Sequence, residues 1–199
     1  MAAALIGPGS AVAAPGEIVA MEPDRFWAII DGTTKLEGDS ERQLAALSKA
    51  LNRLSLADIQ RFEAAFDATM RRSYNWDFWA ADYVAHGGAS DDSFEYFRCW
   101  LISKGRVIFE YVLANPDSLA DSLAPDLHGV LEFEDFAYVA REVWSQKARP
   151  PGQEMPNTAP MMYVGVEPSG TPFAEDDAEL ARRLPRLWKR FGEKPLGLE

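Results

Sequence analysis

The stretch WDFWAADYVAHGGASDDSFEYFRCWLISKGR, residues 76–106, decides the fold. Its first half carries three aromatic rings at spacings of three and four residues, namely Trp76, Trp79 and Tyr83. This spacing places the rings on one face of an α-helix. The double glycine at 87–88 predicts the end of that helix, and Ser90 is a suitable N-cap for a second one that ends near Gly105. The stretch therefore predicts two aromatic-rich helices that meet at a glycine corner.

Helical periodicity continues on both sides of this pair. Apolar residues recur every three or four positions, which predicts further helices in residues 23–32, 39–54, 55–72, 107–116, 116–123 and 133–148. The helix in 39–54 is predicted to begin with a capping box, in which Ser40 is the N-cap and Gln43 its partner. The β-branched residues of VIFEYV leave a short strand as an alternative at 107–112. The sequence therefore predicts an all-α fold, a compact multi-helix domain with a Pro-rich arm and a C-terminal helix.

Composition divides the chain into four segments. Residues 1–20 are apolar but contain prolines and lack a basic start, so we expect a flexible N-terminal extension rather than a signal peptide. Residues 21–148 hold the helical domain, and six prolines in residues 149–172 predict a linker or an irregular arm, in which MMYVGV could pair as a short strand. Residues 173–199 predict an amphipathic helix that Pro185 breaks or kinks, and its basic residues are expected to dock on the acidic domain.

Charge and cysteine content narrow the classes of function. The chain has 31 acidic and 20 basic residues and a formal net charge of −11, which argues against binding to nucleic acid or to an anionic membrane. No apolar run reaches the roughly 18 residues of a membrane span. Cys99 is the only cysteine, so we expect a reducing compartment and a cytoplasmic location. Its helical setting favours a small buried hydrophobe over a reactive thiol.

The aromatic residues predict either a core or a groove. Eleven of the 23 aromatic residues lie between Tyr74 and Tyr111. Each ring buries a large apolar area, which favours a core, but tryptophan and tyrosine also carry a polar atom that needs a partner, which favours a groove for a peptide or a small ligand. The candidate groove or binding residues are Trp76, Asp77, Trp79, Tyr83, Asp91, Asp92, Arg98, Trp100 and Arg106.

The charged residues of this stretch have both a structural and a functional interpretation. The SDD triplet at 90–92 is explained by capping and by the helix dipole, which favours acids in the first turn. Arg98 and Arg106 are predicted to bridge to Asp77, Asp91 or Asp92 and thereby to hold the two helices together. Alternatively, the guanidinium groups of Arg98 and Arg106 recognise a carboxylate or a phosphate.

No standard catalytic or metal-binding motif is present. The chain lacks G-x-S-x-G, the Walker lysine loop, G-x-G-x-x-G and H-E-x-x-H. His86 precedes a double glycine and is expected to be poorly held, and His128 is expected to be exposed in a loop. A metal site of His86, Asp91, Asp92 and Glu95 is therefore not expected, nor is a cofactor, and the catalytic residues stay unknown.

The same residues carry a family resemblance. WDFWAADYVAHGG, SDDSFEYFRCWLISKGR and the later FEDFAYVAREVW resemble the bacterial domain-of-unknown-function 4240 family, and the opening FWAIID fits it too. The resemblance extends from about Glu22 to about Lys147, and the tail PSGTPFAEDDAELARRLPRLWKRF is similar to an extension of some actinobacterial members. The resemblance implies an all-helical fold and a cytoplasmic setting. It implies no established activity, so no catalytic residue follows from it.

Two hypotheses of function follow for this soluble helical domain. The first is a non-enzymatic binding or regulatory module that uses an aromatic-lined groove for an unknown protein or small-molecule partner. The alternative is a small-molecule hydrolase or transferase that uses Asp91, Asp92 and Arg98. The two differ in whether those three side chains converge on a solvent-open pocket or pair off within the fold.

Overall fold

A computed structural model describes residues 18–36, 38–127, 129–156 and 165–197. These residues form α-helices and short 3-10 helices and no strand, which confirms the predicted all-α fold. Within the described ranges, one isolated β-bridge pairs Asn75 with Ser169. The expectations for His128, for most of the N-terminal extension and for MMYV at 161–164 lie outside the described residues.

The helices up to Ser122 follow one another with short connections, whereas longer segments precede the helices that begin at Glu134 and Asp177. The first are α1 (Pro23–Asp31), η1 (Thr34–Leu36), α2 (Ser40–Leu51), α3 (Leu56–Arg72), α4 (Trp76–His86), α5 (Asp91–Ser103) and α6 (Arg106–Ala114). After them come η2 (Pro116–Ser118), α7 (Leu119–Ser122), η3 (Glu134–Ala137), α8 (Val139–Lys147), α9 (Asp177–Arg183) and α10 (Pro185–Phe191). The helix predicted at 133–148 divides into η3 and α8, and Pro185 separates two short helices. In the part of the chain that the structure describes, no helix has the length and apolar character that a membrane span needs.

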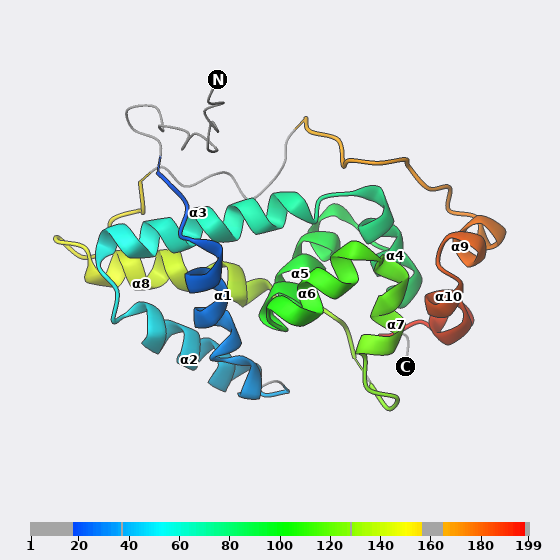
Figure 1. The fold of residues 1–199 in the computed structure, drawn as a ribbon, viewed down its shortest axis with the longest axis horizontal. Coiled ribbons are helices and arrows are strands. Elements are labelled where there is room, and N and C mark those ends of the chain that lie inside the picture. Colours follow the sequence, from blue (N-terminus) through cyan, green and yellow to red (C-terminus); the bar gives the residue numbers. More distant parts are fainter. Residues whose placement is uncertain (1–17, 37, 128, 157–164, 198–199) are drawn as a thin grey trace, which may run out of the picture.

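The central helix of the domain is α5, which contacts α1, α3, α4, α6 and η3 (Figure 1). Its large apolar side chains Phe94, Phe97, Leu101 and Ile102 have no exposed surface. Burial of each such side chain contributes about 1.5–3 kcal/mol. The core is therefore built around the second helix of the aromatic stretch.

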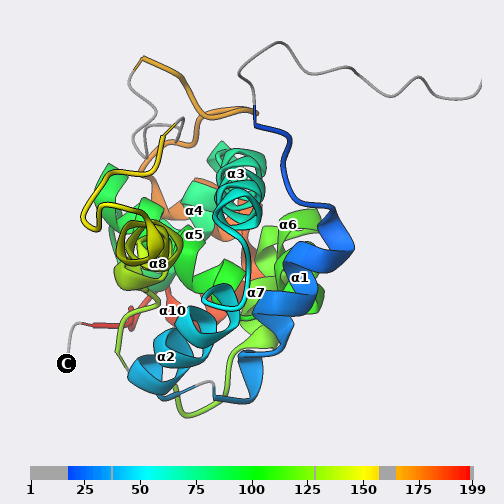
Figure 2. The ribbon, with the colours of Figure 1, turned by 90° about the vertical axis from the view of Figure 1, so that its left-hand side faces the viewer.

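Two of the helices, α3 and α8, run side by side and are seen nearly end-on in Figure 2. The first begins at its predicted N-cap, Ser55, whose side chain accepts a hydrogen bond from the Asp58 N–H at 3.1 Å. Its apolar stripe of Ile59, Phe62 and Phe66 is buried. Capping and periodicity thus agree for this helix.

The start of α2 differs from the predicted capping box. The N-cap is Asp39 rather than Ser40, and its side chain accepts from the Arg42 N–H at 3.1 Å. The Gln43 side chain is buried instead, and its amide donates to the Ser103 carbonyl at 2.8 Å. The last carbonyls of an α-helix have no donor within that helix. The prediction was wrong because Gln43 donates to such a carbonyl at the end of α5.

The corner between α4 and α5 forms as predicted. Asn75 caps α4 by accepting from the Phe78 N–H at 2.9 Å, and Gly87 ends the helix in the left-handed region, at φ 72°. Ser90 then caps α5 in a reciprocal capping box with Ser93. Local chemistry therefore decides where the chain turns and presents the two aromatic-rich helices to each other.

The C-terminal helices dock on the helical domain, as their charge predicted. Arg186 donates to Asp117 at 3.0 Å and also pairs with Asp121. Leu187 and Phe191 are buried, and α10 packs against α4 at the right-hand side of Figure 1. The tail is thus part of the folded structure and lies beside the first aromatic helix.

Candidate functional site

The aromatic residues of the decisive stretch divide into a core set and a surface set. The buried rings include Phe78, Phe94, Phe97 and Phe109, with no exposed surface, and Trp100, which is 9% exposed. The half-buried rings that form the aromatic face are Tyr74, Trp76, Trp79 and Tyr83. The core interpretation is therefore confirmed for the first set, whereas the rings of the second set lie at the surface.

Stacking holds the aromatic face in place. The rings of Trp76 and Trp79 are stacked with centroids 5.3 Å apart and planes 11° apart. Trp79 is stacked in turn on the buried ring of Phe94, at 4.8 Å. Its indole N–H donates to the Ala89 carbonyl at 3.4 Å. Contacts within the helical domain therefore hold Trp76 and Trp79 in position.

Residues 165–176, here called the strap, lie along the aromatic face. The Trp76 N–H donates to the Ser169 carbonyl at 2.9 Å, and the Ser169 N–H donates to the Tyr74 carbonyl at 3.1 Å. The Tyr74 hydroxyl donates to the Val166 carbonyl at 3.3 Å. From these contacts the orange trace in Figure 1 leads to α9 and α10. The strap is therefore an extended segment that pairs through its main chain.

Phe173 is the side chain of the strap that contacts the aromatic face. Its ring packs edge-on against Trp76, with centroids 6.0 Å apart, and against Tyr83, at 5.4 Å. Two residues later, the Glu175 carboxylate accepts a hydrogen bond from the Tyr83 hydroxyl at 3.2 Å. Burial, and then this carboxylate, raise the pKa of Tyr83, so the hydroxyl keeps its proton and remains a donor.

Arg183 of α9 clamps the strap onto α4. Its Nε donates to the Asp77 carboxylate at 2.6 Å, and its two terminal nitrogens donate to the carbonyls of Thr171 and Pro172. A guanidinium group suits this position because its donors form a rigid fork. Asp77, one of the predicted binding residues, therefore positions an arginine that holds the strap by its backbone.

Arg98 lies beneath this face rather than on it. It is 1% exposed, and it donates to the carbonyls of Phe94, at 3.2 Å, and Met70, at 3.0 Å. Backbone carbonyls thus occupy donors for which a bridge to an acid was predicted. Asp91 and Asp92 are exposed in the first turn of α5. The three side chains of the hydrolase or transferase alternative therefore do not converge on a solvent-open pocket.

Arg106 and Trp100 contact other parts of the fold. The Arg106 guanidinium pairs with Asp24 of α1 at 2.7 Å, and its backbone N–H donates to Asp31 at 2.9 Å. The predicted bridge from Arg106 to an acid of α4 or α5 was wrong, because α6 begins against α1. Trp100 is stacked on Phe97 in the core, at 5.9 Å.

His86 is firmly held, so the expectation of a poorly held ring was wrong. Its Nε2 accepts from the Leu131 N–H at 2.9 Å, so the proton lies on Nδ1, which donates to Asp82 at 2.7 Å. Both ring nitrogens are thus engaged in structural bonds. In the described part of the chain, no three metal-ligating side chains are grouped to hold an ion.

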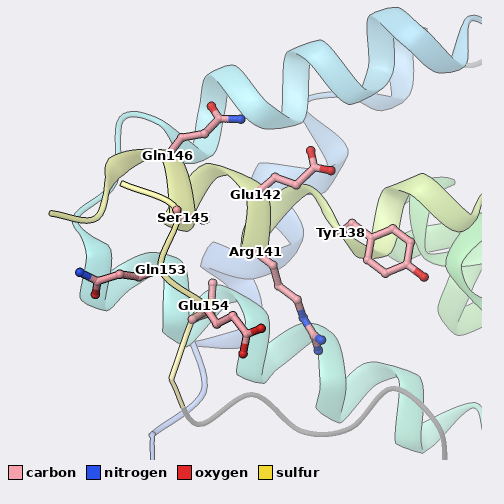
Figure 3. Close-up of a pocket in the computed structure, with 9 residues that line it drawn as sticks. Tyr138, Arg141, Glu142, Ser145, Gln146, Gln153 and Glu154 are labelled. Carbon is pink, nitrogen blue, oxygen red and sulfur yellow. The ribbon is translucent and has the colours of Figure 1, made fainter. Parts of the chain in front are cut away.

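A charged cluster of Arg141, Glu63 and Asp67 lies where α8 packs on α3. A pocket of about 800 Å³ lies beside α8. Figure 3 shows its lining residues, with the Arg141 side chain extending away from that helix. The Arg141 Nε donates to Glu63 of α3, and its guanidinium lies 4.0 Å from Asp67. Glu63 is 2% exposed, and within the described ranges its Oε2 has no hydrogen-bond partner. Burial raises the pKa of Glu63 to about 7, although Arg141 lowers it.

The sequence held signals for the burial of two acids, Glu63 and Asp82, and they were missed. Glu63 falls within an apolar stripe, four residues after Ile59 and three before Phe66. Asp82 precedes His86 by four residues on the same helix, a spacing that brings the two side chains together. The contact of Phe173 with α4 had no local signal, because about 90 residues separate the partners.

Glu63→Gln is expected to flatten the pH dependence of stability. The folded chain keeps a proton up to about pH 7 that the unfolded chain releases near 4.5, so the free energy of unfolding falls as pH rises between these values. From pH 5 to pH 7 the fall is about 2 kcal/mol, at 1.36 kcal/mol per pKa unit. Urea unfolding at both pH values measures it, with Glu142→Gln, an exposed acid of α8, as control. An unchanged pH dependence in Glu63→Gln would contradict the prediction.

A family model described as "Protein of unknown function (DUF4240)" matches residues 21–146, well over half of the chain. The chain belongs to this family. The predicted resemblance is thereby confirmed. No curated protein and no solved structure matches the chain. The DUF4240 match includes the aromatic face of α4 and ends before the strap, α9 and α10. Phe173 and Arg183 therefore reach the DUF4240 domain from outside the matched region.

Proposed function

We propose that the DUF4240 domain of this chain is a non-enzymatic binding module whose aromatic face takes an extended peptide segment with an aromatic side chain. One observation carries the proposal, namely that Phe173 packs against Trp76 and Tyr83 while the strap pairs with the α4 start through its main chain. Main-chain pairing supplies affinity in such complexes, and a side-chain contact supplies specificity.

The rigidity of the aromatic face supports this proposal. Tryptophan and tyrosine dominate the energetics of protein interfaces, and binding costs less when their rings are already ordered. The stack of Trp76 on Trp79, and of Trp79 on Phe94, provides that order. The hydrolase or transferase alternative has less support, because its Arg98 is buried and bonded to backbone carbonyls.

The proposed partner is a protein segment, and the proposed setting is the cytoplasm. A net charge of −11 supports a protein rather than nucleic acid as partner. The single cysteine, Cys99, supports a reducing compartment. Burial raises the pKa of the Cys99 thiol, which keeps it protonated and unreactive.

A labelled peptide of residues 165–177 is expected to bind the full chain that carries Phe173→Ala. This substitution empties the ring contact on Trp76 and Tyr83, so the peptide can supply its own phenylalanine. Fluorescence anisotropy should give a dissociation constant of roughly 10–100 μM, because a short flexible peptide loses conformational entropy when it binds.

Two matched comparisons locate the binding. A peptide with alanine in place of Phe173 should not bind at these concentrations. Adding Trp76→Ala to the protein should abolish binding of the original peptide, whereas Tyr138→Ala, at the pocket beside α8, should leave it unchanged. Circular dichroism checks that each variant is folded. Equal binding of the two peptides would refute the proposal.

A further inference from the structure

The strap is held more lightly than the tail that follows it. Within residues 165–176, Pro168 is buried and Phe173 half-buried, and every other position is exposed. The segment after the strap, residues 177–191, buries four large apolar side chains, namely Leu180, Leu184, Leu187 and Phe191. A segment with few buried contacts opens at a lower free-energy cost than a packed one. We therefore expect the strap to open before α9 and α10 do.

The helices α9 and α10 also have contacts that do not involve the strap. Arg186 bonds to Asp117 through both its backbone N–H and its guanidinium. Arg190 donates to the carbonyls of Ala120 and Leu123. These bonds, with the buried leucines, keep the tail docked when the strap lifts. The aromatic face can therefore be uncovered without unfolding the C-terminal helices.

The contacts of the strap define the chemistry of any segment that would replace it. The edge-on contacts of Phe173 call for an aromatic ring, and the Tyr83 hydroxyl calls for a carboxylate two residues later. The Arg183 fork calls for backbone carbonyls just before the ring, in an extended chain. Neither a phosphate nor a nucleobase combines these three features.

We infer that the strap is a built-in competitor for the aromatic face, and that the external partner is an extended protein segment in which an acid follows an aromatic residue by two positions. The inference rests on the proposed binding function and adds its regulation and its partner. A tethered segment competes at an effective concentration in the millimolar range, so a free partner binds weakly until the strap is weakened.

The experiment compares the affinity of the labelled 165–177 peptide for three full-length chains. They are the wild type, Phe173→Ala, and Val166→Ala, which shortens an exposed strap side chain without touching the ring contacts. We expect Phe173→Ala to bind at least about 10-fold more tightly than the wild type, equivalent to about 1.4 kcal/mol. Val166→Ala should bind like the wild type.

Hydrogen exchange supplies a second readout of the strap itself. The Ser169 N–H bonds to the Tyr74 carbonyl only while the strap is docked. Saturating peptide should therefore speed exchange of the protein's own Ser169 amide in the wild type. In Phe173→Ala that amide should exchange fast even without peptide.

Each failure has its own meaning. Equal peptide affinity of the wild type and Phe173→Ala would overturn the competitor role and leave the proposed binding function intact. Absence of binding to Phe173→Ala, although its Ser169 amide exchanges fast, would overturn the binding function itself. A peptide carrying Glu175→Gln should bind about 3-fold or more weakly, and unchanged binding would overturn the requirement for an acid.

Discussion

His86→Ala is expected to lower the free energy of unfolding by about 3–5 kcal/mol, since it removes a hydrogen bond from a buried carboxylate and also leaves the buried Leu131 N–H without its acceptor. Asp82 has no exposed surface, and its Oδ2 has no hydrogen-bond partner among the residues that the structure describes. The imidazole supplies the bond to Oδ1 and accepts the Leu131 N–H. Urea unfolding at pH 7 measures the loss.

The loss should depend on pH and on the charge of Asp82. Burial raises the pKa of Asp82 while the bond from His86 lowers it, so removal of His86 raises this pKa further. A raised folded-state pKa means that stability falls as pH rises, so His86→Ala should lose less at pH 4 than at pH 7. The double variant Asp82→Asn, His86→Ala carries no buried charge and should recover about half of the loss. A double variant no more stable than His86→Ala would show that charge burial is not the cause.

Gly105→Ala is expected to cost about 3 kcal/mol and to damage the start of α6. Gly105 has φ +88° and ψ 172°, a conformation that is nearly restricted to glycine and costs other residues about 1–3 kcal/mol. An added Cβ would lie 2.5 Å from Oδ1 of Asp31 and 3.0 Å from Cγ2 of Thr34. Asp31 must then move, which breaks its bond to the Arg106 N–H, a helix-capping contact of about 1 kcal/mol.

Gly38→Ala separates the two parts of that cost. Gly38 has nearly the same φ, +89°, but an added Cβ there would have no neighbour within 4 Å in the described part of the chain. It should therefore lose only the conformational part, about 1–2 kcal/mol. Thermal unfolding of the two variants gives the difference that belongs to the contact with Asp31. Equal losses would mean that the close approach at Gly105 costs nothing.

The helices were predictable because their signals are local. Ser55, Asn75 and Ser90 cap helices whose apolar residues recur at spacings of three and four. The same reasoning failed at Gln43, which satisfies a carbonyl of α5 sixty residues away in place of its own helix start. It also failed for Arg106, whose partner belongs to α1. Polar side chains with distant partners leave no periodic trace in a sequence.

Of the candidate site, the aromatic face of α4 could be predicted from the sequence, but the strap that covers it could not. The spacing of Trp76, Trp79 and Tyr83 identified the face of α4. It could not identify the segment that covers this face, because Phe173 follows a Pro-rich arm without periodicity. Arg183 was predicted only as part of a basic helix that docks on acids, and its bond to Asp77 bears this out. That the same guanidinium also holds backbone carbonyls depends on where the strap runs.

The strap has a consequence for kinetics, because anchored chain flanks it on both sides. Met155 is buried before it, and Leu180 of α9 is buried after it. When the strap lifts it stays tethered at both ends, so it closes again on the same rings. Under the competition inferred above, an external segment binds only while the strap is open, so at high concentrations of that segment its association rate saturates at the opening rate. At those concentrations the chain itself, rather than collision in solution, sets the rate.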